Sequence, residues 1–227
     1  MNRSMKKTIE WASILLIHPI YLAFLILADA WTYIRYPDLL IYEIYLAGRK
    51  ITAVFKRAPT PPLGDIKDVD LTYGETPFVT LNYIFEPYIK KGSNAIFVDL
   101  GCGFGKAVMF MAQRFKIEAV GIDIVTHFIQ VATSFTRKQK KNKPTFLNEN
   151  IRHANFARGT HFFLPWTCFG LEMVAQLTEN CETMRPEAIV VTTSFPLKSP
   201  CFETLKVQRA FFSWGIGHVY IQKRRPT

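Results

Sequence analysis

The chain has 227 residues, a formal net charge of +10 at pH 7 and four cysteines, a length that accommodates one α/β domain with surplus residues at one end. The cysteines, which lie far apart without a C-x-x-C pair, argue against a zinc site and a disulfide framework and favour a reducing compartment; they are Cys102, Cys168, Cys181 and Cys201. The positive charge favours an acidic partner, namely an anionic lipid surface, a nucleic acid or an acidic protein face, without choosing among them.

The first predicted element is a hydrophobic helix over residues 11–28, whose only polar side chains are Ser13 and His18. Eighteen residues are about the shortest run that spans the hydrocarbon core of a bilayer. Basic residues precede this run, aromatic residues follow it, and no small-residue cleavage site is present. We therefore expect a single membrane anchor rather than a signal peptide. The alternative is a hydrophobic helix packed on the folded domain, which the marginal length and Pro19 favour.

A second helix is predicted after Pro37, because apolar residues recur at helical intervals at Leu40, Ile44, Ala47, Ile51 and Val54. Such a basic amphipathic helix lies on a membrane surface or packs on the domain. Residues 58–64 are proline-rich and predict a stiff linker. The expected organisation is an N-terminal membrane-anchor or membrane-associated helical region (1–57), this linker, and a folded domain (65–227).

Strands and helices alternate through the rest of the chain. Helices are predicted over 77–90, 106–115 and 125–140, strands over 95–100, 117–122, 151–156, 161–164 and 188–193, and a closing hairpin over 211–214 and 219–223. This order predicts the α/β class: a doubly wound seven-stranded sheet with a C-terminal antiparallel hairpin, preceded by N-terminal hydrophobic and amphipathic helices.

A glycine turn joins the strand at 95–100 to the following helix. Its glycines let the backbone pass close to a ligand and adopt positive φ; they are Gly101, Gly103 and Gly105. A dinucleotide fold has G-x-G-x-x-G, whereas here Lys106 stands where the third glycine is expected. Asp99 ahead of the turn and Asp123 at the end of the next strand are instead typical of the S-adenosylmethionine site of Rossmann-like methyltransferases. Asp123 is expected to accept the ribose hydroxyl protons.

The tetrapeptide Tyr73-Gly74-Glu75-Thr76 precedes the first helix of the domain. With it the chain resembles the disruptor-of-telomeric-silencing family of non-SET lysine methyltransferases, over about Leu71 to Lys223. The same resemblance rests on the glycine turn, Asn155-Phe156, Phe169-Gly170-x-Glu172 and Ser213-Trp214. The membrane-anchored type that methylates a lysine of the mitochondrial ATP-synthase c-subunit is similar in architecture.

This resemblance implies the cofactor-binding residues. Loop 73–76 is expected to close over the methionine end of S-adenosylmethionine through Tyr73, Gly74 and Thr76. Asp99 and the turn at Gly101, Gly103 and Gly105 are expected to hold the methionine moiety. Asp123 would then bind the ribose, and Asn155 and Phe156 would bind the adenine. Core packing remains the alternative for Phe156, and an ordinary turn the alternative for Asn155.

The chain departs from this family at residues 165–169. The family carries Asn-Asn-Phe-Ala-Phe, whereas this chain has Pro-Trp-Thr-Cys-Phe, which removes the amides beside the target nitrogen. Pro165 and Trp166 are the candidates for turning a carbonyl and an aromatic wall toward an amine, with core packing the alternative for Trp166. Glu75 or His161 would assist proton removal; the alternatives are that Glu75 orders its loop and that His161 lies at the entrance of a strand. No metal site is predicted.

The leading functional hypothesis is a methyltransferase of protein lysines that acts near a membrane, with its domain facing the cytosol or an equivalent interior compartment. Methylation of a lipid or an apolar small molecule is the main alternative. Histone methylation and a non-enzymatic scaffold are weaker ones, and no nucleic acid is required. Removal of residues 1–57 is expected to release the protein from membranes and to leave cofactor affinity intact.

Overall fold

The structure is a computed structural model that describes residues 3–55, 74–137, 139, 143–167 and 169–226, with side chains of the first range described from residue 19 to residue 49. The described strands form one sheet in the order β3-β2-β1-β4-β5-β7-β6. They are β1 (Ile96–Leu100), β2 (Glu118–Asp123), β3 (Thr145–Asn148), β4 (His161–Leu164), β5 (Ile189–Thr193), β6 (Phe202–Phe212) and β7 (Gly215–Arg224). The first five are parallel, whereas β7 is antiparallel to both β5 and β6.

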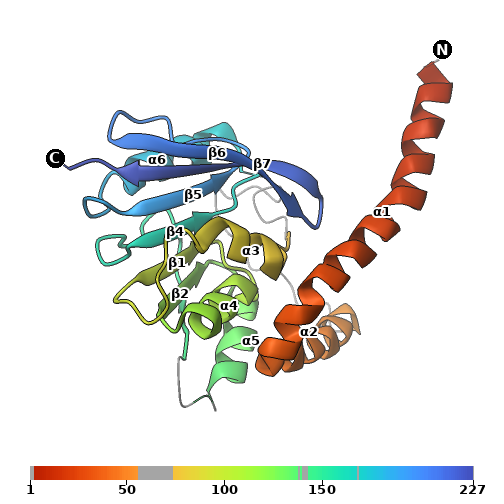
Figure 1. Ribbon diagram of the computed structural model, residues 1–227, viewed down its shortest axis with the longest axis horizontal. Helices are drawn as coiled ribbons and strands as arrows, with labels where there is room; N and C mark the ends of the chain where they lie inside the picture. The colour runs from red at the N-terminus through yellow and green to blue at the C-terminus, as the bar shows by residue number, and fades with distance from the viewer. Residues whose placement is uncertain (1–2, 56–73, 138, 140–142, 168, 227) are drawn as a thin grey trace.

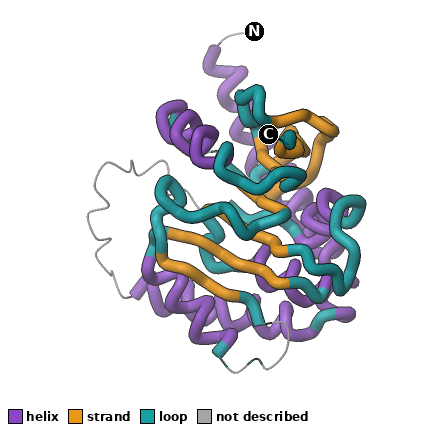
Figure 2. Tube along the Cα trace, turned by 90° about the vertical axis from the view of Figure 1, so that its left-hand side faces the viewer, coloured by secondary structure: helices purple, strands orange, loops and turns teal. Residues whose placement is uncertain are grey.

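The described helices pack around this sheet. They are α1 (Arg3–Arg35), α2 (Pro37–Phe55), α3 (Phe78–Phe85), α4 (Lys106–Phe115), α5 (Thr126–Thr136) and α6 (Leu171–Cys181). Figure 2 shows helices on both sides of the strands. Two buried clusters result: one includes side chains of α2, α3 and α4, and the other includes side chains of α6 and the segment 151–156. The predicted α/β class, the doubly wound order and the closing hairpin are confirmed.

The third strand lies earlier in the chain than the sequence pattern predicted. It is formed by residues 145–148, which pair with β2, whereas the predicted strand 151–156 forms turns. The Asn180 side-chain amide donates hydrogen bonds to the carbonyls of Ile151, Arg152 and Ala154, at 3.1, 3.3 and 3.2 Å. These carbonyls therefore need no neighbouring strand, and the apolar side chains there join the same buried cluster as side chains of α6.

One face of the C-terminal half of α1 and one face of α2 pack against the rest of the molecule. Figure 1 shows the N-terminal half of α1 projecting away from the sheet, and its C-terminal half beside α2. Leu39, Tyr42 and Leu46 of α2 are fully buried in the same cluster as α3 and α4. The hydroxyl of Tyr21 donates to the carbonyl of Phe212 at 2.8 Å, at the end of β6. Packing on the domain, the alternative considered above, therefore holds for the buried face of each helix.

No helix in the part of the chain that the structure describes is long and apolar enough to cross a membrane. Side chains of residues 11–18 of the predicted anchor, and the predicted linker 58–64 with the boundaries around it, lie outside the described residues. The division of the chain at residues 57 and 65 thus stays a prediction.

Candidate active site

The glycine turn at the carboxyl end of β1 has the conformation that its spacing predicted. Gly101, Gly103 and Gly105 have φ values of 84°, 52° and 78°, a region that residues with a Cβ rarely adopt. A Cβ at Gly105 would overlap the ring of Phe146, whereas a Cβ at Gly101 would approach only the tip of Phe169, at 3.8 Å. Gly101 is exposed, so the turn presents bare backbone to open space at the edge of the sheet where ligands bind in such folds.

Asp123 ties this turn to the end of β2. One carboxylate oxygen accepts the amide hydrogen of Gly103 and the other accepts that of Val125, both at 2.8 Å. Burial raises the pKa of this carboxyl, and hydrogen bonds from these two amides and from that of Ile124 act in the opposite direction. Each carboxylate oxygen can accept a second hydrogen bond. The position is therefore compatible with the predicted contact to ribose hydroxyls.

Asp99 is the unusual group of the site. It is fully buried on β1, and its Oδ1 atom has no hydrogen-bond partner among the described residues. Burial, reinforced by the charge of Asp123, raises the pKa of Asp99 to about 8. A buried polar oxygen without a partner is costly. The α-amino group of S-adenosylmethionine would supply a cationic donor, so the residues present fit this cofactor with its methionine end at Asp99.

The loop at 74–77 lies against the turn of the C-terminal hairpin. A Cβ at Gly74 would stand 2.7 Å from the indole of Trp214, so the ring covers this glycine closely. The amide of Glu75 donates to the Ser213 hydroxyl at 3.2 Å, and the Ser213 amide donates to the Glu75 carbonyl at 3.3 Å. Thr76 is buried. The predicted contributor Tyr73 lies outside the described residues.

The two residues predicted to hold the adenine occupy ordinary structural positions. The side chain of Asn155 accepts the amide hydrogen of Ala157 at 2.9 Å, which closes a turn on the surface. Phe156 is buried and packs against Phe162, with ring centroids 5.8 Å apart. These contacts match the turn and core alternatives, and a contact with adenine stays a prediction for both.

The residues predicted to do chemistry are dispersed. Trp166 is fully buried and donates its indole N–H to the carbonyl of Phe195 at 3.0 Å, so its ring is part of the core, beside the half-buried Pro165. His161 begins β4, at the end of the sheet opposite the glycine turn. Its ring nitrogens contact Thr160 and the Tyr88 carbonyl. This position matches the strand-entrance alternative for His161.

Sequence reasoning overlooked a group of hydroxyls at the carboxyl ends of β4 and β5. The hydroxyls of Thr167 and Thr193 are 2.9 Å apart, and that of Ser194 donates to Thr167 at 3.1 Å. Ser194 has a φ of 67°, which is uncommon for a residue other than glycine. No sequence motif predicts this group, because its two segments are distant in the sequence and only strand pairing brings them together.

A second omission is the pair of carboxylates around Lys106, the first residue of α4. Its ammonium contacts Glu43 of α2 and, at 2.6 Å, Glu75 of the loop. The available signal was the replacement of an expected glycine by a lysine. The sequence placed Glu75 in the site, either ordering its loop or moving a proton, but its ion pair with Lys106 was not predicted.

The comparisons with known proteins agree with this geometry. The family model described as histone methylation protein DOT1 matches residues 67–163. An RNA methyltransferase from Salinibacter ruber, in complex with S-adenosyl-L-homocysteine, superposes with a TM-score of 0.56 at 17% identity, over 67% of this chain and 95% of that chain. The chain has the fold of class I methyltransferases.

Two further methyltransferase-fold structures support this assignment. The putative methyltransferase yhhF from Escherichia coli gives a TM-score of 0.55 at 15% identity, over 74% of this chain and 92% of its own. A geranyl diphosphate C-methyltransferase from Streptomyces coelicolor gives a TM-score of 0.53 at 11% identity, over 66% of this chain and 76% of that chain. The search of curated protein sequences finds no match. Together the comparisons confirm the predicted methyltransferase fold and support S-adenosylmethionine as the cofactor.

Proposed function

We propose that the protein is an S-adenosylmethionine-dependent methyltransferase that modifies a lysine of a protein at a membrane surface. The observation that carries the methyltransferase assignment is the unpartnered Asp99 oxygen beside the open glycine turn. The choice of lysine is supported by the match of residues 67–163 to the histone methylation family model. The choice of a membrane surface is supported by an apolar face of α1.

The cofactor supplies a methyl group on a sulfonium, a leaving group that is already activated. The chain's own residues bind the cofactor and orient it. Asp99 accepts a hydrogen bond from the cofactor ammonium, and Asp123 accepts hydrogen bonds from the ribose while holding the turn. Both carboxyls are buried, so little water competes with these contacts. Alignment and exclusion of water are what an in-line displacement requires most.

The acceptor amine must be neutral before it attacks. The hydroxyls of Thr167, Thr193 and Ser194 at the ends of β4 and β5 carry no charge, and they offer oxygen lone pairs to an amine N–H. An uncharged, poorly hydrated surrounding lowers the pKa of a lysine, because it disfavours the ammonium. We assign this hydroxyl group to the acceptor side of the site.

The membrane-facing surface follows from the spacing of exposed apolar residues on α1. We call it the α1 stripe: Ile20, Phe24, Leu27, Trp31 and Ile34, which are 71%, 53%, 73%, 66% and 81% exposed. The opposite face of the same helix carries the buried Leu25 and Asp29. A helix with one face on the protein and one apolar face in solvent suits the boundary of a bilayer, and the net charge of +10 suits anionic lipid.

One observation favours the alternative, methylation of a lipid or an apolar small molecule. The turn of the β6–β7 hairpin exposes Phe211, Trp214 and Ile216, and Phe24 of the α1 stripe lies against Phe211 with ring centroids 6.0 Å apart. This contact joins the apolar face of α1 to the hairpin, whose Trp214 covers Gly74. A lipid would meet such a surface on its way to the site.

The deciding experiment incubates the purified full chain with methyl-labelled S-adenosylmethionine and a lysate that contains membranes. Label in a discrete protein band, recovered as methyl-lysine, supports the proposal, whereas label in the lipid extract supports the alternative. Asp99→Ala is the inactive control, because it removes the proposed partner of the cofactor ammonium. Labelling that survives in Asp99→Ala would come from a contaminant.

A further inference from the structure

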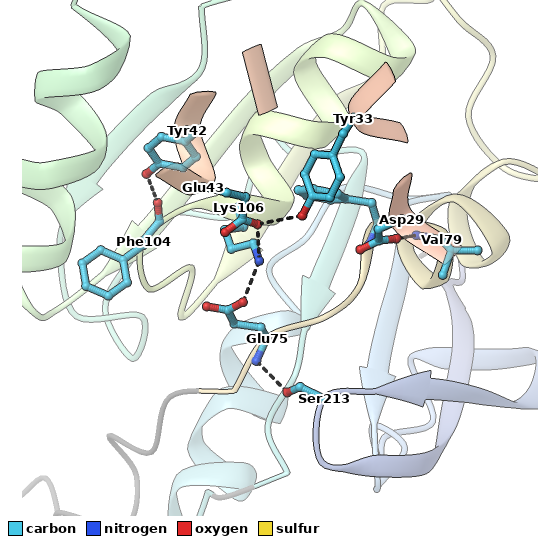
Figure 3. A network of polar contacts seen from close by, with 10 residues as sticks. Asp29, Tyr33, Tyr42, Glu43, Glu75, Val79, Phe104, Lys106 and Ser213 are labelled. Carbon is cyan, nitrogen blue, oxygen red and sulfur yellow. Dashed lines mark hydrogen bonds and ion pairs between the residues drawn. The ribbon is translucent and has the colours of Figure 1, made fainter. Parts of the chain in front are cut away.

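One cation joins the N-terminal helices to the cofactor loop. Lys106 opens α4 directly after the glycine turn, and its ammonium lies between the carboxylates of Glu43 and Glu75 (Figure 3). Glu43 belongs to α2, and Glu75 belongs to the loop at 74–77. The three side chains come from segments that are far apart in the sequence and meet only in the folded chain.

The burial of this cluster makes the contacts strong. The side chains of Lys106, Glu43 and Glu75 are 15%, 23% and 27% exposed. Burial lowers the pKa of Lys106, but the two carboxylates outweigh it, so the pKa is raised overall and the ammonium stays charged. Removal of Lys106 would leave the two carboxylates without their shared cation, which costs more than loss of an exposed pair.

Both glutamates of the Lys106 cluster make further contacts that hold them in place. On the side of α1, the hydroxyl of Tyr33 donates to Glu43 at 3.4 Å. On the side of the hairpin, Glu75 exchanges backbone and hydroxyl contacts with Ser213 (Figure 3). The same loop then enters α3, whose first amides are capped from α1 by Asp29. The N-terminal helices thus restrain the loop both at Glu75 and just beyond Pro77.

We propose that Glu43 is a positioning residue for the cofactor, through which α2 holds Lys106, and thereby the loop at Glu75, in the cofactor-binding arrangement. This inference rests on the proposed function, because it takes loop 74–77 as part of the S-adenosylmethionine site. Glu43 touches neither cofactor nor substrate, and it acts only through Lys106. A loop that is ordered before binding loses less conformational freedom when the ligand arrives, which raises affinity.

The test compares Glu43→Gln with Glu86→Gln in the full chain. Glu86 pairs with Arg114 at the other end of α4, at 2.7 Å, and is therefore a matched control. Calorimetry with S-adenosyl-L-homocysteine measures affinity. We expect Glu43→Gln to bind about three- to tenfold more weakly, somewhat less than a directly lost charged contact would cause, and Glu86→Gln to bind as the wild type does. KM for S-adenosylmethionine should rise with kcat little changed.

A double variant separates positioning from general stabilisation. Lys106→Met should weaken binding at least as much as Glu43→Gln, because it removes the cation that Glu43 and Glu75 share. Because Glu43 acts through Lys106, adding Glu43→Gln to Lys106→Met should cause no further loss. Hydrogen exchange of the peptide that contains residues 74–79 should accelerate in Glu43→Gln and not in Glu86→Gln.

Three outcomes would overturn the inference. They are additive losses in the double variant, wild-type affinity in Glu43→Gln, and a lower melting temperature without any change in affinity or loop exchange. If Glu43→Gln does not fold, Tyr33→Phe removes the hydroxyl that contacts Glu43 and carries the same comparison of affinity and loop exchange. A wild-type chain that fails to bind S-adenosyl-L-homocysteine would instead refute the proposed function, which keeps the two failures distinguishable.

Discussion

The carboxylate of Asp29 on α1 accepts the amide hydrogen of Val79 at 2.8 Å, and thereby caps α3 from a different helix. The residue at the start of α3, Pro77, provides no side-chain cap of its own. Asp29 also accepts the amide of Phe78 at 3.0 Å and is buried. The helix that follows loop 74–77 therefore depends on a residue almost fifty positions earlier in the chain.

Asp29→Ala should destabilise the fold by about 1–2 kcal/mol, the usual loss when a helix cap is removed. The reason is that two amides at the start of α3 lose their acceptor. Urea unfolding followed by circular dichroism measures the free energy. Glu203→Ala, an exposed position on β6, is the control and should stay within about 0.5 kcal/mol of the wild type. Equal stability of the two variants would show that the cap is not needed.

Cofactor binding should release a proton from Asp99 near neutral pH. Its pKa is raised to about 8 in the free protein, so most of the carboxyl is protonated at pH 7. A cationic donor from the cofactor lowers that pKa on binding. Affinity for S-adenosyl-L-homocysteine should therefore rise between pH 6 and pH 8. Calorimetry in two buffers of different ionisation enthalpy measures the number of protons released on binding. Asp99→Asn should abolish the dependence of affinity on pH. A binding enthalpy that is equal in both buffers would contradict the prediction.

The same group should make the free protein less stable as pH rises. A carboxyl whose pKa is raised by folding contributes stability that is fully present below its unfolded value of 3.8 and is lost by about pH 8. The difference in unfolding free energy between wild type and Asp99→Asn should therefore shift against the wild type from pH 5 to pH 8. Urea titrations at the two pH values measure it. A difference that stays constant would show that Asp99 titrates in its ordinary range.

Removal of residues 1–57 should unfold the domain, contrary to the expectation from sequence that cofactor affinity would survive. Truncation strips Leu39, Tyr42 and Leu46 from the core, each fully buried. At roughly 1.5–3 kcal/mol for each buried side chain, this loss is comparable to a whole domain's stability of about 5–15 kcal/mol. Removal of residues 1–18 is the control and should leave a folded protein. Solubility and thermal melting of the two truncations decide the matter, and a folded 58–227 fragment would contradict it.

Charge placed on the α1 stripe should reduce membrane binding without affecting the fold. Leu27→Glu and Ile34→Glu replace side chains that are 73% and 81% exposed, so the free protein loses little packing. Each substitution should weaken binding to vesicles that contain anionic lipid by about tenfold or more, because an apolar side chain no longer enters the bilayer. Co-sedimentation with vesicles measures it. Val207→Glu, at an exposed apolar position on β6, is the control; equal losses in all three variants would refute a role specific to α1.

The amino-acid sequence by itself determined the fold class and the position of the glycine turn. These features depend on neighbours in the chain: the alternation of strands and helices, and the three glycines with positive φ between Asp99 and α4. Short-range patterns report such backbone preferences directly. The closing hairpin was predicted for the same reason, although its strands extend further than the pattern indicated.

Only the tertiary structure decided which side chains meet. The contacts of Lys106 with Glu43 and of Asp29 with Val79 join segments that lie far apart in sequence, and no local pattern encodes such pairs. Likewise, Trp166 belongs to the core because the segment around Phe195 folds over it. Residues 151–156 form turns because Asn180 satisfies their carbonyls. Packing and buried polar contacts decide which of the structures compatible with the local patterns is formed. The free energies of these contacts depend on residues from the whole chain.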